Sequence, residues 1–109
     1  MRDQSLEFLR ALMEAPSPSG YEQPAQSVVR AYASEFADEV RTDVMGNVIA
    51  SKNGAGTPRV MLAGHVDEIG LIVSYIDDNG FITFKPIGGW DTTVLVGQTV
   101  TIHTADGPV

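Results

Sequence analysis

The sequence has no cysteine among its 109 residues, so it can form neither disulfide bonds nor thiolate metal sites. Basic residues are also scarce: seven lysines and arginines stand against fourteen aspartates and glutamates, which gives a formal net charge of −7. Nucleic acids and anionic membranes are bound by basic patches, so this charge argues against both as partners. Any metal ion would have to be held by histidine, aspartate and glutamate.

Long apolar runs are missing as well. No run approaches the roughly 20 residues of a membrane-spanning helix, and the N-terminus leads into an amphipathic stretch instead of an apolar signal region. We therefore expect a soluble cytoplasmic protein. With 43% hydrophobic residues the chain can build a core, and its length suits one small domain or pieces of two.

The beginning of the chain predicts two helices. In residues 3–15, Leu6, Leu9 and Met13 recur at spacings of three and four, and two prolines then end the helix. Ser19 and Glu22 stand three residues apart, the capping-box pattern of a new helix. The apolar stripe of this second helix is expected to pack in the core; its members are Ala25, Val28, Val29, Tyr32 and Phe36.

Residues 60–63 form the apolar run on which the site prediction depends. A short continuous run of this kind predicts a strand buried on both faces, as in a helix-covered parallel sheet. Before it, alternation in residues 40–44, a turn at 45–47 and a return strand at 48–52 predict a hairpin. The polar residues that follow position 64 would then lie at the carboxyl end of a buried strand, where open α/β sheets place their sites.

His65 and Asp67 follow this run at a spacing of two, so on an extended chain their side chains point to the same side. A neutral imidazole is a good ligand for zinc and similar metals, and a carboxylate commonly holds its other ring nitrogen. The spacing alone also suits a polar loop histidine followed by a turn-forming aspartate. Glu68 points to the opposite face of an extended chain and is expected to be structural.

The surrounding sequence is more specific. Residues 62–73, Leu-Ala-Gly-His-Val-Asp-Glu-Ile-Gly-Leu-Ile-Val, closely resemble the metal-site segment of the tetrahedral aminopeptidases, a family of dinuclear metallopeptidases also described as glutamyl or deblocking aminopeptidases. Residues 16–22, 43–50 and 81–90 resemble the same family and occur in its order. By this resemblance His65 would be a metal ligand and Asp67 the catalytic-site carboxylate that orients it.

After Asp67 the pattern changes to strands alone, expected at residues 69–76, 81–87 and 99–104. Residues 77–80 resemble part of a calcium loop but are expected to form a hairpin turn, Trp90 to anchor the β-rich part, and His103 to be an exposed strand residue. An Asp-Gly turn signal at 106–107 comes too late for a return strand to be expected. The buried strand also lacks partners, so the chain is expected to be the opening fragment of a longer protein.

Pattern and resemblance together predict an α/β fold. Residues 1–70 would be the N-terminal part of a helix-covered, zinc-peptidase-like mixed sheet, and residues 71–109 the truncated beginning of an inserted small β-barrel assembly domain. The resemblance implies a parent enzyme that uses two zinc or cobalt ions to remove N-terminal residues from peptides. It also implies dimers that assemble to a dodecamer.

Only one ligand and one supporting carboxylate can be named here, whereas a catalytic zinc typically has three protein ligands. The chain alone is therefore expected to be inactive. Two other interpretations stay open: a non-catalytic binding or assembly module, and a hydrolase of another substrate class such as glucans, because some relatives carry an endoglucanase label.

Overall fold

Two helices open the chain, as the apolar spacing predicts. The computed structural model describes residues 2–109, in which helix α1 spans Asp3–Glu14 and helix α2 spans Gln23–Ser34. Helix α1 ends just before Pro16, whose ring cannot continue a helix. The rings of Phe8 on α1 and Tyr32 on α2 stack with their centroids 4.1 Å apart, and this contact helps to hold the two helices together.

The predicted capping box at the start of α2 is not formed. Helix α2 begins at Gln23, and its N-cap residue Glu22 makes no capping hydrogen bond with its side chain. The Glu22 carboxylate accepts a hydrogen bond from the Gly20 backbone N–H instead, at 2.6 Å. Ser19 lies outside the helix, and its hydroxyl bonds elsewhere. The pattern therefore located the helix correctly but assigned the wrong role to Ser19.

A short antiparallel hairpin lies against α2, as expected for residues 40–52. Strand β1 (Glu39–Thr42) pairs with β2 (Val48–Ser51), with Thr42 opposite Val48. The turn between them is held by Asp43, whose carboxylate accepts hydrogen bonds from the Met45 and Asn47 backbone N–H groups. Among residues 2–109 the buried side chains gather here and nearby: Ala25, Ala33 and Ser17.

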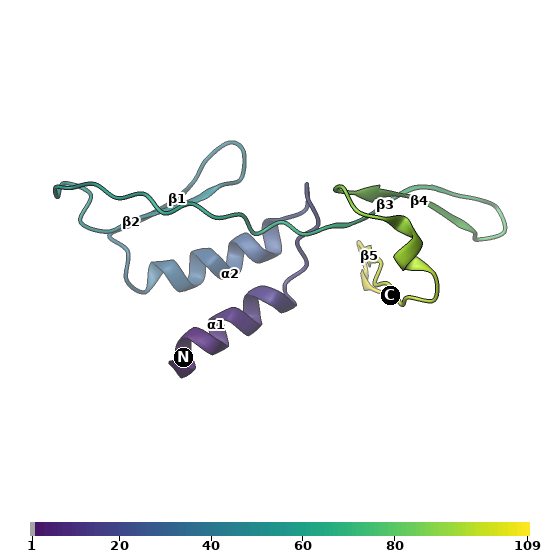
Figure 1. Cartoon of the computed structure of the whole chain (residues 1–109), viewed down its shortest axis with the longest axis horizontal. Helices are drawn as coiled ribbons and strands as arrows, with labels where there is room; N and C mark the ends of the chain where they lie inside the picture. Colours follow the sequence, from purple (N-terminus) through teal and green to yellow (C-terminus); the bar gives the residue numbers. More distant parts are fainter. Residues whose placement is uncertain (1) are drawn as a thin grey trace.

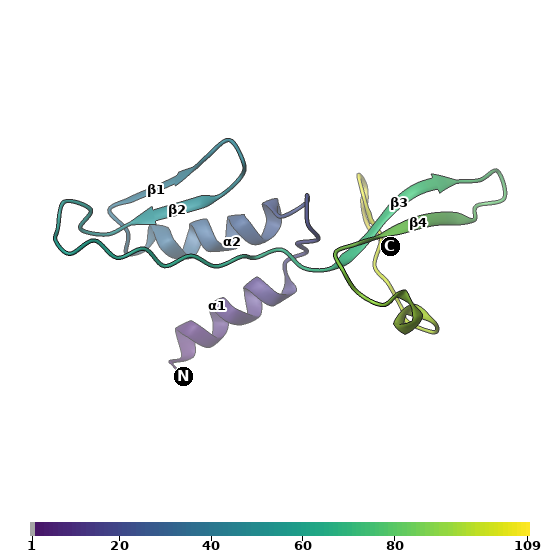
Figure 2. The ribbon, with the colours of Figure 1, turned by 45° about the horizontal axis from the view of Figure 1, so that its top comes forward.

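The buried strand predicted for residues 60–63 is wrong. The segment is extended but pairs with no strand within residues 2–109. Its side chains are exposed, Leu62 at 94%. A buried parallel strand needs neighbours on both edges to bond its backbone, and the described residues form three two-stranded antiparallel sheets only. The run belongs to the long extended connection between β2 and β3, which passes beside α2 (Figures 1 and 2).

The β-rich part begins with a long hairpin. Strand β3 (Gly70–Ile76) pairs with β4 (Ile82–Ile87), and the register shifts between Val73 and Tyr75. The connection at 77–81 is the expected turn, because the Asp77 carboxylate accepts hydrogen bonds from the Asn79 and Phe81 backbone N–H groups. Trp90 donates its indole N–H to the Ile87 carbonyl at 2.9 Å, consistent with the predicted anchor.

The end of the chain differs from the prediction in two ways. A single turn of 3-10 helix, η1 (Thr92–Leu95), follows the hairpin. The strand predicted over 99–104 is reduced to β5 (His103–Thr104), and it does have a return strand, β6 (Gly107–Pro108). Each of these strands has only two residues, but the pairing continues beyond them. Ile102 and Val109, which flank β5 and β6, exchange two backbone hydrogen bonds. His103 is exposed, as expected.

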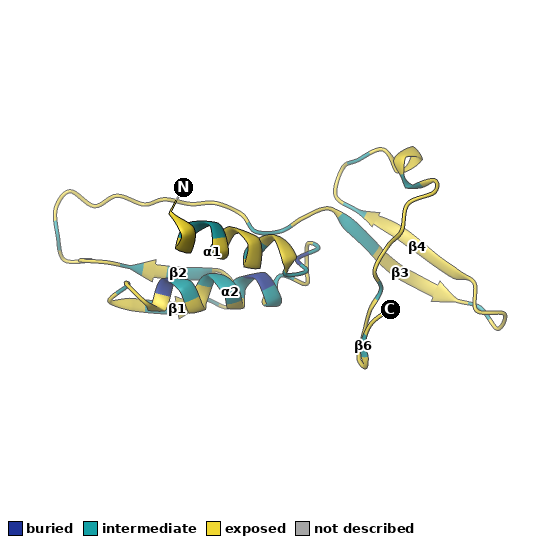
Figure 3. Ribbon diagram, turned by 90° about the horizontal axis from the view of Figure 1, so that it is seen from below, coloured by how far each residue is buried: buried dark blue, intermediate teal, exposed yellow. Residues whose placement is uncertain are grey.

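The elements form two groups along an elongated molecule of 60 × 32 × 30 Å. One group contains α1, α2, β1 and β2, and the other contains β3 to β6 with η1 (Figure 1). Figure 3 shows that the buried positions belong to the first group. Within residues 2–109, no helix has the length and apolar character that crossing a membrane requires.

Candidate metal site

The segment that carries His65 and Asp67 is held by the loop between the two helices. The Glu68 backbone N–H donates to the Ser17 carbonyl at 2.9 Å, and the Ser19 N–H donates to the Glu68 carbonyl at 3.3 Å. Pro18 and Glu68 thereby form an isolated parallel bridge. The Glu68 carboxylate also accepts from the Ser17 N–H at 3.1 Å, which agrees with its expected structural role.

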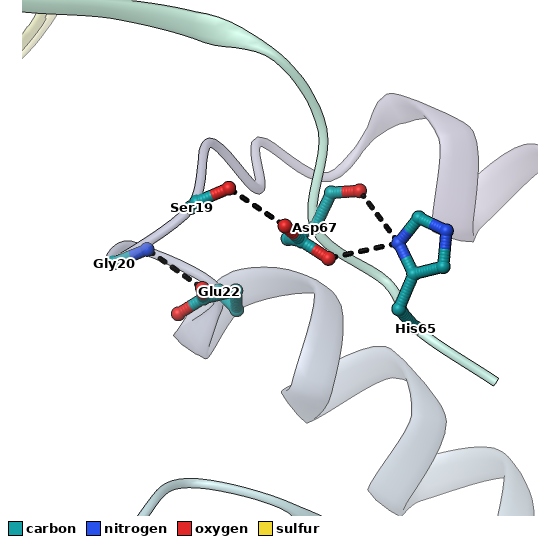
Figure 4. Close-up of polar contacts among 5 residues, drawn as sticks. All are labelled: Ser19, Gly20, Glu22, His65 and Asp67. Carbon is teal, nitrogen blue, oxygen red and sulfur yellow. Dashed lines mark hydrogen bonds and ion pairs between the residues drawn. The ribbon is translucent and has the colours of Figure 1, made fainter. Parts of the chain in front are cut away.

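His65 and Asp67 face each other, as their spacing predicts for an extended chain (Figure 4). The imidazole Nδ1 lies 2.8 Å from the Asp67 carboxylate Oδ1 and 3.2 Å from the Asp67 backbone carbonyl. Both of these oxygens are acceptors, so Nδ1 must carry the proton. In the neutral ring this leaves the lone pair on Nε2, the atom on the far side of the ring from Asp67. A metal ion could bind there.

Ser19 completes the arrangement from the other side. Its hydroxyl donates to the second oxygen of Asp67, Oδ2, at 2.6 Å (Figure 4). This hydrogen bond is the largest cause that lowers the pKa of the Asp67 carboxyl below its ordinary value, and the hydrogen bond from His65 is the next. Asp67 is therefore a carboxylate at neutral pH, which keeps both of its oxygens available as acceptors.

The site opens to solvent. The His65 side chain is 85% exposed and that of Asp67 39% exposed. Both residues line a shallow cleft of about 310 Å³. The first turns of α2 and the β1–β2 turn form its other walls, through Glu22, Gln23, Gln26, Ser27, Arg30, Thr42, Met45, Gly46 and Asn47.

The structure brings together the two predicted site residues, but it adds no further ligand to them. Within residues 2–109, no group of three or more histidine, aspartate or glutamate side chains is placed to hold one metal ion. His103 lies in β5, with its ring 6.0 Å from that of Tyr21. The residues described here therefore offer one imidazole nitrogen and one orienting carboxylate.

Sequence reasoning missed the part played by Ser19, which it assigned to a helix cap. Ser19 and Asp67 are 48 residues apart, so no local spacing connects them. The only available signal was that both lie in stretches that resemble one family.

Comparisons with known proteins agree with that resemblance. Residues 46–109 match the model of the M42 glutamyl aminopeptidase family. The chain is 39% identical to a lysyl aminopeptidase of Pyrococcus furiosus over 102 residues, which are 93% of this chain and 29% of that protein.

Two solved structures are also similar to this chain. A TET aminopeptidase from a marine sediment Thaumarchaeota archaeon superposes with a TM-score of 0.91 at 42% identity, covering 99% of this chain and 30% of that one. An endoglucanase of Thermotoga maritima gives a TM-score of 0.71 at 34% identity, covering 77% and 27%. The chain thus spans less than a third of the length of these relatives. Its match over more than half of its residues shows that the chain belongs to the M42 glutamyl aminopeptidase family.

Proposed function

We propose that this chain supplies one ligand, with its supporting carboxylate, to the metal centre of an aminopeptidase, an enzyme that removes N-terminal residues from peptides. The observation that carries the proposal is the way in which the His65 ring is held and exposed. Its Nδ1 is held by Asp67 at 2.8 Å, its side chain is 85% exposed, and the residue lines the cleft. A histidine held in this way is the usual form of a metal-ligating imidazole.

The chemistry of the donor set fits divalent zinc or cobalt, since imidazole and carboxylate serve both ions. In the proposed enzyme two such ions, when bound, would polarise the scissile carbonyl and lower the pKa of a bound water. The residues described here have a narrower task. His65 would hold one ion through Nε2, and Asp67 would fix the ring's orientation and keep the proton on Nδ1.

Membership of the family and the names of the relatives as aminopeptidases support a peptide substrate. The same proposal includes further metal ligands and a general base outside residues 2–109, assembly of dimers into a dodecamer, and a cytoplasmic location. It also includes a division into a catalytic part, residues 1–70, and the beginning of an inserted β-barrel, residues 71–109. Both α-helices lie before Gly70, and the β3–β4 hairpin begins there, which supports this boundary.

The likeness to an endoglucanase keeps a second candidate, a glucan hydrolase. Glycosidases usually work with a pair of carboxylates and without a dinuclear metal site, so a chelator separates the two candidates. A third candidate, a non-catalytic assembly module, is favoured by the exposed apolar side chains of β3 and β4, such as Tyr75 and Phe84.

The experiment uses an enzyme that contains this chain within a full family-length sequence, with aminoacyl chromogenic substrates and a soluble glucan offered in parallel. We expect peptide hydrolysis that a chelator abolishes and that zinc or cobalt restores. His65→Ala should remove it, whereas His103→Ala, the matched change at the other histidine, should leave it intact. Glucan hydrolysis that survives the chelator would overturn the proposal.

The 109-residue chain on its own gives the complementary test. Incubated with zinc or cobalt and the same peptide substrates, it should show no turnover, because one ligand does not build a catalytic site. Turnover that persists through purification and disappears in His65→Ala would show that the chain contains a complete site.

A further inference from the structure

Ser19 occupies an unusual position for a serine just before a helix. It does not cap α2, and its hydroxyl proton is directed to the Asp67 carboxylate on a segment 48 residues away. The two oxygens of Asp67 are thereby divided between two donors: Oδ2 accepts from Ser19 at 2.6 Å, and Oδ1 accepts from His65 Nδ1 at 2.8 Å. Figure 4 shows the three side chains in this order.

Backbone hydrogen bonds fix the position of Ser19 independently of its side chain. Its N–H donates to the Glu68 carbonyl, one residue beyond Asp67, and the Ser17 carbonyl accepts from the Glu68 N–H. Ser17 is buried, with 5% of its surface exposed. The hydroxyl therefore reaches Asp67 from a loop that is fixed to the same segment by main-chain hydrogen bonds.

The carboxylate itself needs such a constraint. The terminal torsion of an aspartate side chain has broad preferences, and the Asp67 side chain is 39% exposed to water. A donor on Oδ2 restricts rotation of the carboxylate, because turning it breaks this bond. Oδ1 then stays directed at Nδ1 of His65. An imidazole whose Nδ1–H is held in this way keeps the lone pair on Nε2.

We propose that Ser19 is a positioning residue, which orients Asp67 and through it selects the Nδ1–H tautomer of His65. This role depends on the proposed function in one respect: its purpose would be to present Nε2 to a metal ion. The tautomer exists without any metal and can be measured without activity.

The test is the tautomer of His65 in the metal-free 109-residue chain, read from long-range ¹H–¹⁵N NMR correlations at a pH at which both imidazoles are neutral. The chain has only two histidines, so His103 serves as the internal reference. We expect the Nδ1–H form to predominate at His65. In Ser19→Ala the two ring-nitrogen shifts of His65 should move towards each other as the tautomers mix, while those of His103 stay in place.

Two matched variants separate positioning from a general loss of structure. Ser34→Ala removes a hydroxyl on α2 that donates to the Arg30 carbonyl of the same helix and lies outside the cleft, and it should leave the His65 shifts unchanged. Glu68→Ala removes a side-chain contact between the same two segments without touching Asp67. It should also leave the tautomer in place. Ser19→Thr, which keeps the hydroxyl, should restore the wild-type shifts.

Each other outcome overturns the role of Ser19. These are a predominant Nε2–H form in the unmodified chain, an unchanged tautomer in Ser19→Ala, or an equal shift in Glu68→Ala. If Ser19→Ala does not fold, Ser19→Cys, with its weak donor, replaces it with the same expected direction. Addition of zinc distinguishes this result from the proposed function: if zinc shifts the His65 resonances and Ser19→Ala leaves the tautomer unchanged, only the role of Ser19 is wrong.

Discussion

The two groups of elements in this molecule fold by different means. Around α2, the helices and the β1–β2 hairpin enclose Ala25 and Ala33, which are 0% and 5% exposed. The β-rich group from Gly70 onward contains no buried residue within the described chain. Its strands are held by backbone pairing and by turns, such as the one that Asp77 closes with two hydrogen bonds.

This difference shows what each part depends on. The first group buries part of its apolar surface within itself, and burial is the main favourable term in folding. The second leaves large apolar side chains in water, although an isolated two-stranded hairpin is only marginally stable. The exposed apolar side chains of this second group include Ile72, Tyr75, Ile76, Phe81 and Phe84. Substitutions should therefore affect the two groups unequally.

The largest effect is expected at the centre of the first group. Ala25→Leu places a larger side chain where no surface is exposed, and overpacking of this kind should lower the free energy of unfolding by about 3 kcal/mol. Urea denaturation measures the change. Ala31→Leu makes the same substitution on the exposed side of α2 and should alter stability little. Equal losses in both variants would show that α2 does not pack as described.

The next effect concerns the point where the two groups meet. A Cβ atom on Gly70 would lie 2.8 Å from the Pro18 Cβ, so Gly70→Ala must push the loop and strand β3 apart. We expect a loss of about 1–2 kcal/mol in the same denaturation experiment.

Gly89→Ala is the matched control for this junction, because nothing lies within 4 Å of a Cβ atom at that position. It should be close to neutral. A neutral Gly70→Ala would mean that the Pro18–Glu68 bridge does not hold the two segments together.

A pair of phenylalanine truncations compares the groups directly. Phe8→Ala removes a ring that stacks on Tyr32 and should cost about 2 kcal/mol. Phe84→Ala removes a ring that is already 46% exposed and should cost about 1 kcal/mol. If the loss at Phe84 is the greater, the β3–β4 hairpin is covered in solution and the contrast between the two groups disappears.

The smallest effect depends on pH. A side-chain hydrogen bond from Asn47 is the largest cause that lowers the pKa of the Asp43 carboxyl in the folded chain. A lowered folded pKa adds stability that is fully present above the unfolded pKa of about 3.9 and is lost as the pH falls through the folded value. Asp43→Ala should therefore be less stable than the unmodified chain at pH 7, and the two curves should converge below about pH 3.9.

Asp78→Ala is the control for this pH dependence, because no hydrogen bond within residues 2–109 reaches that carboxylate. It should leave the stability at pH 7 close to that of the unmodified chain. A gap between the Asp43→Ala and unmodified curves that persists at low pH would assign the effect to the turn itself and not to the charge.

Local patterns predicted the elements whose hydrogen bonds are local. Apolar spacing found α1 and α2, and alternation with turn residues found the β1–β2 and β3–β4 hairpins. The failures are non-local: residues 60–63 form no strand because an apolar run does not specify its pairing partners, and Ser19 bonds to Asp67 instead of capping a helix. At the site, the facing of His65 and Asp67 follows from strand periodicity, whereas the third member, Ser19, required the fold.

The most direct test of the account is a zinc titration of the 109-residue chain, followed through the ring resonances of its two histidines. We predict that His65 shifts first, with the change at Nε2, and that Asp67→Ala weakens this response while His103 remains unaffected at the same zinc concentration. A response at His103 before His65, or binding through Nδ1 of His65, would contradict the assignment of His65 as the metal ligand.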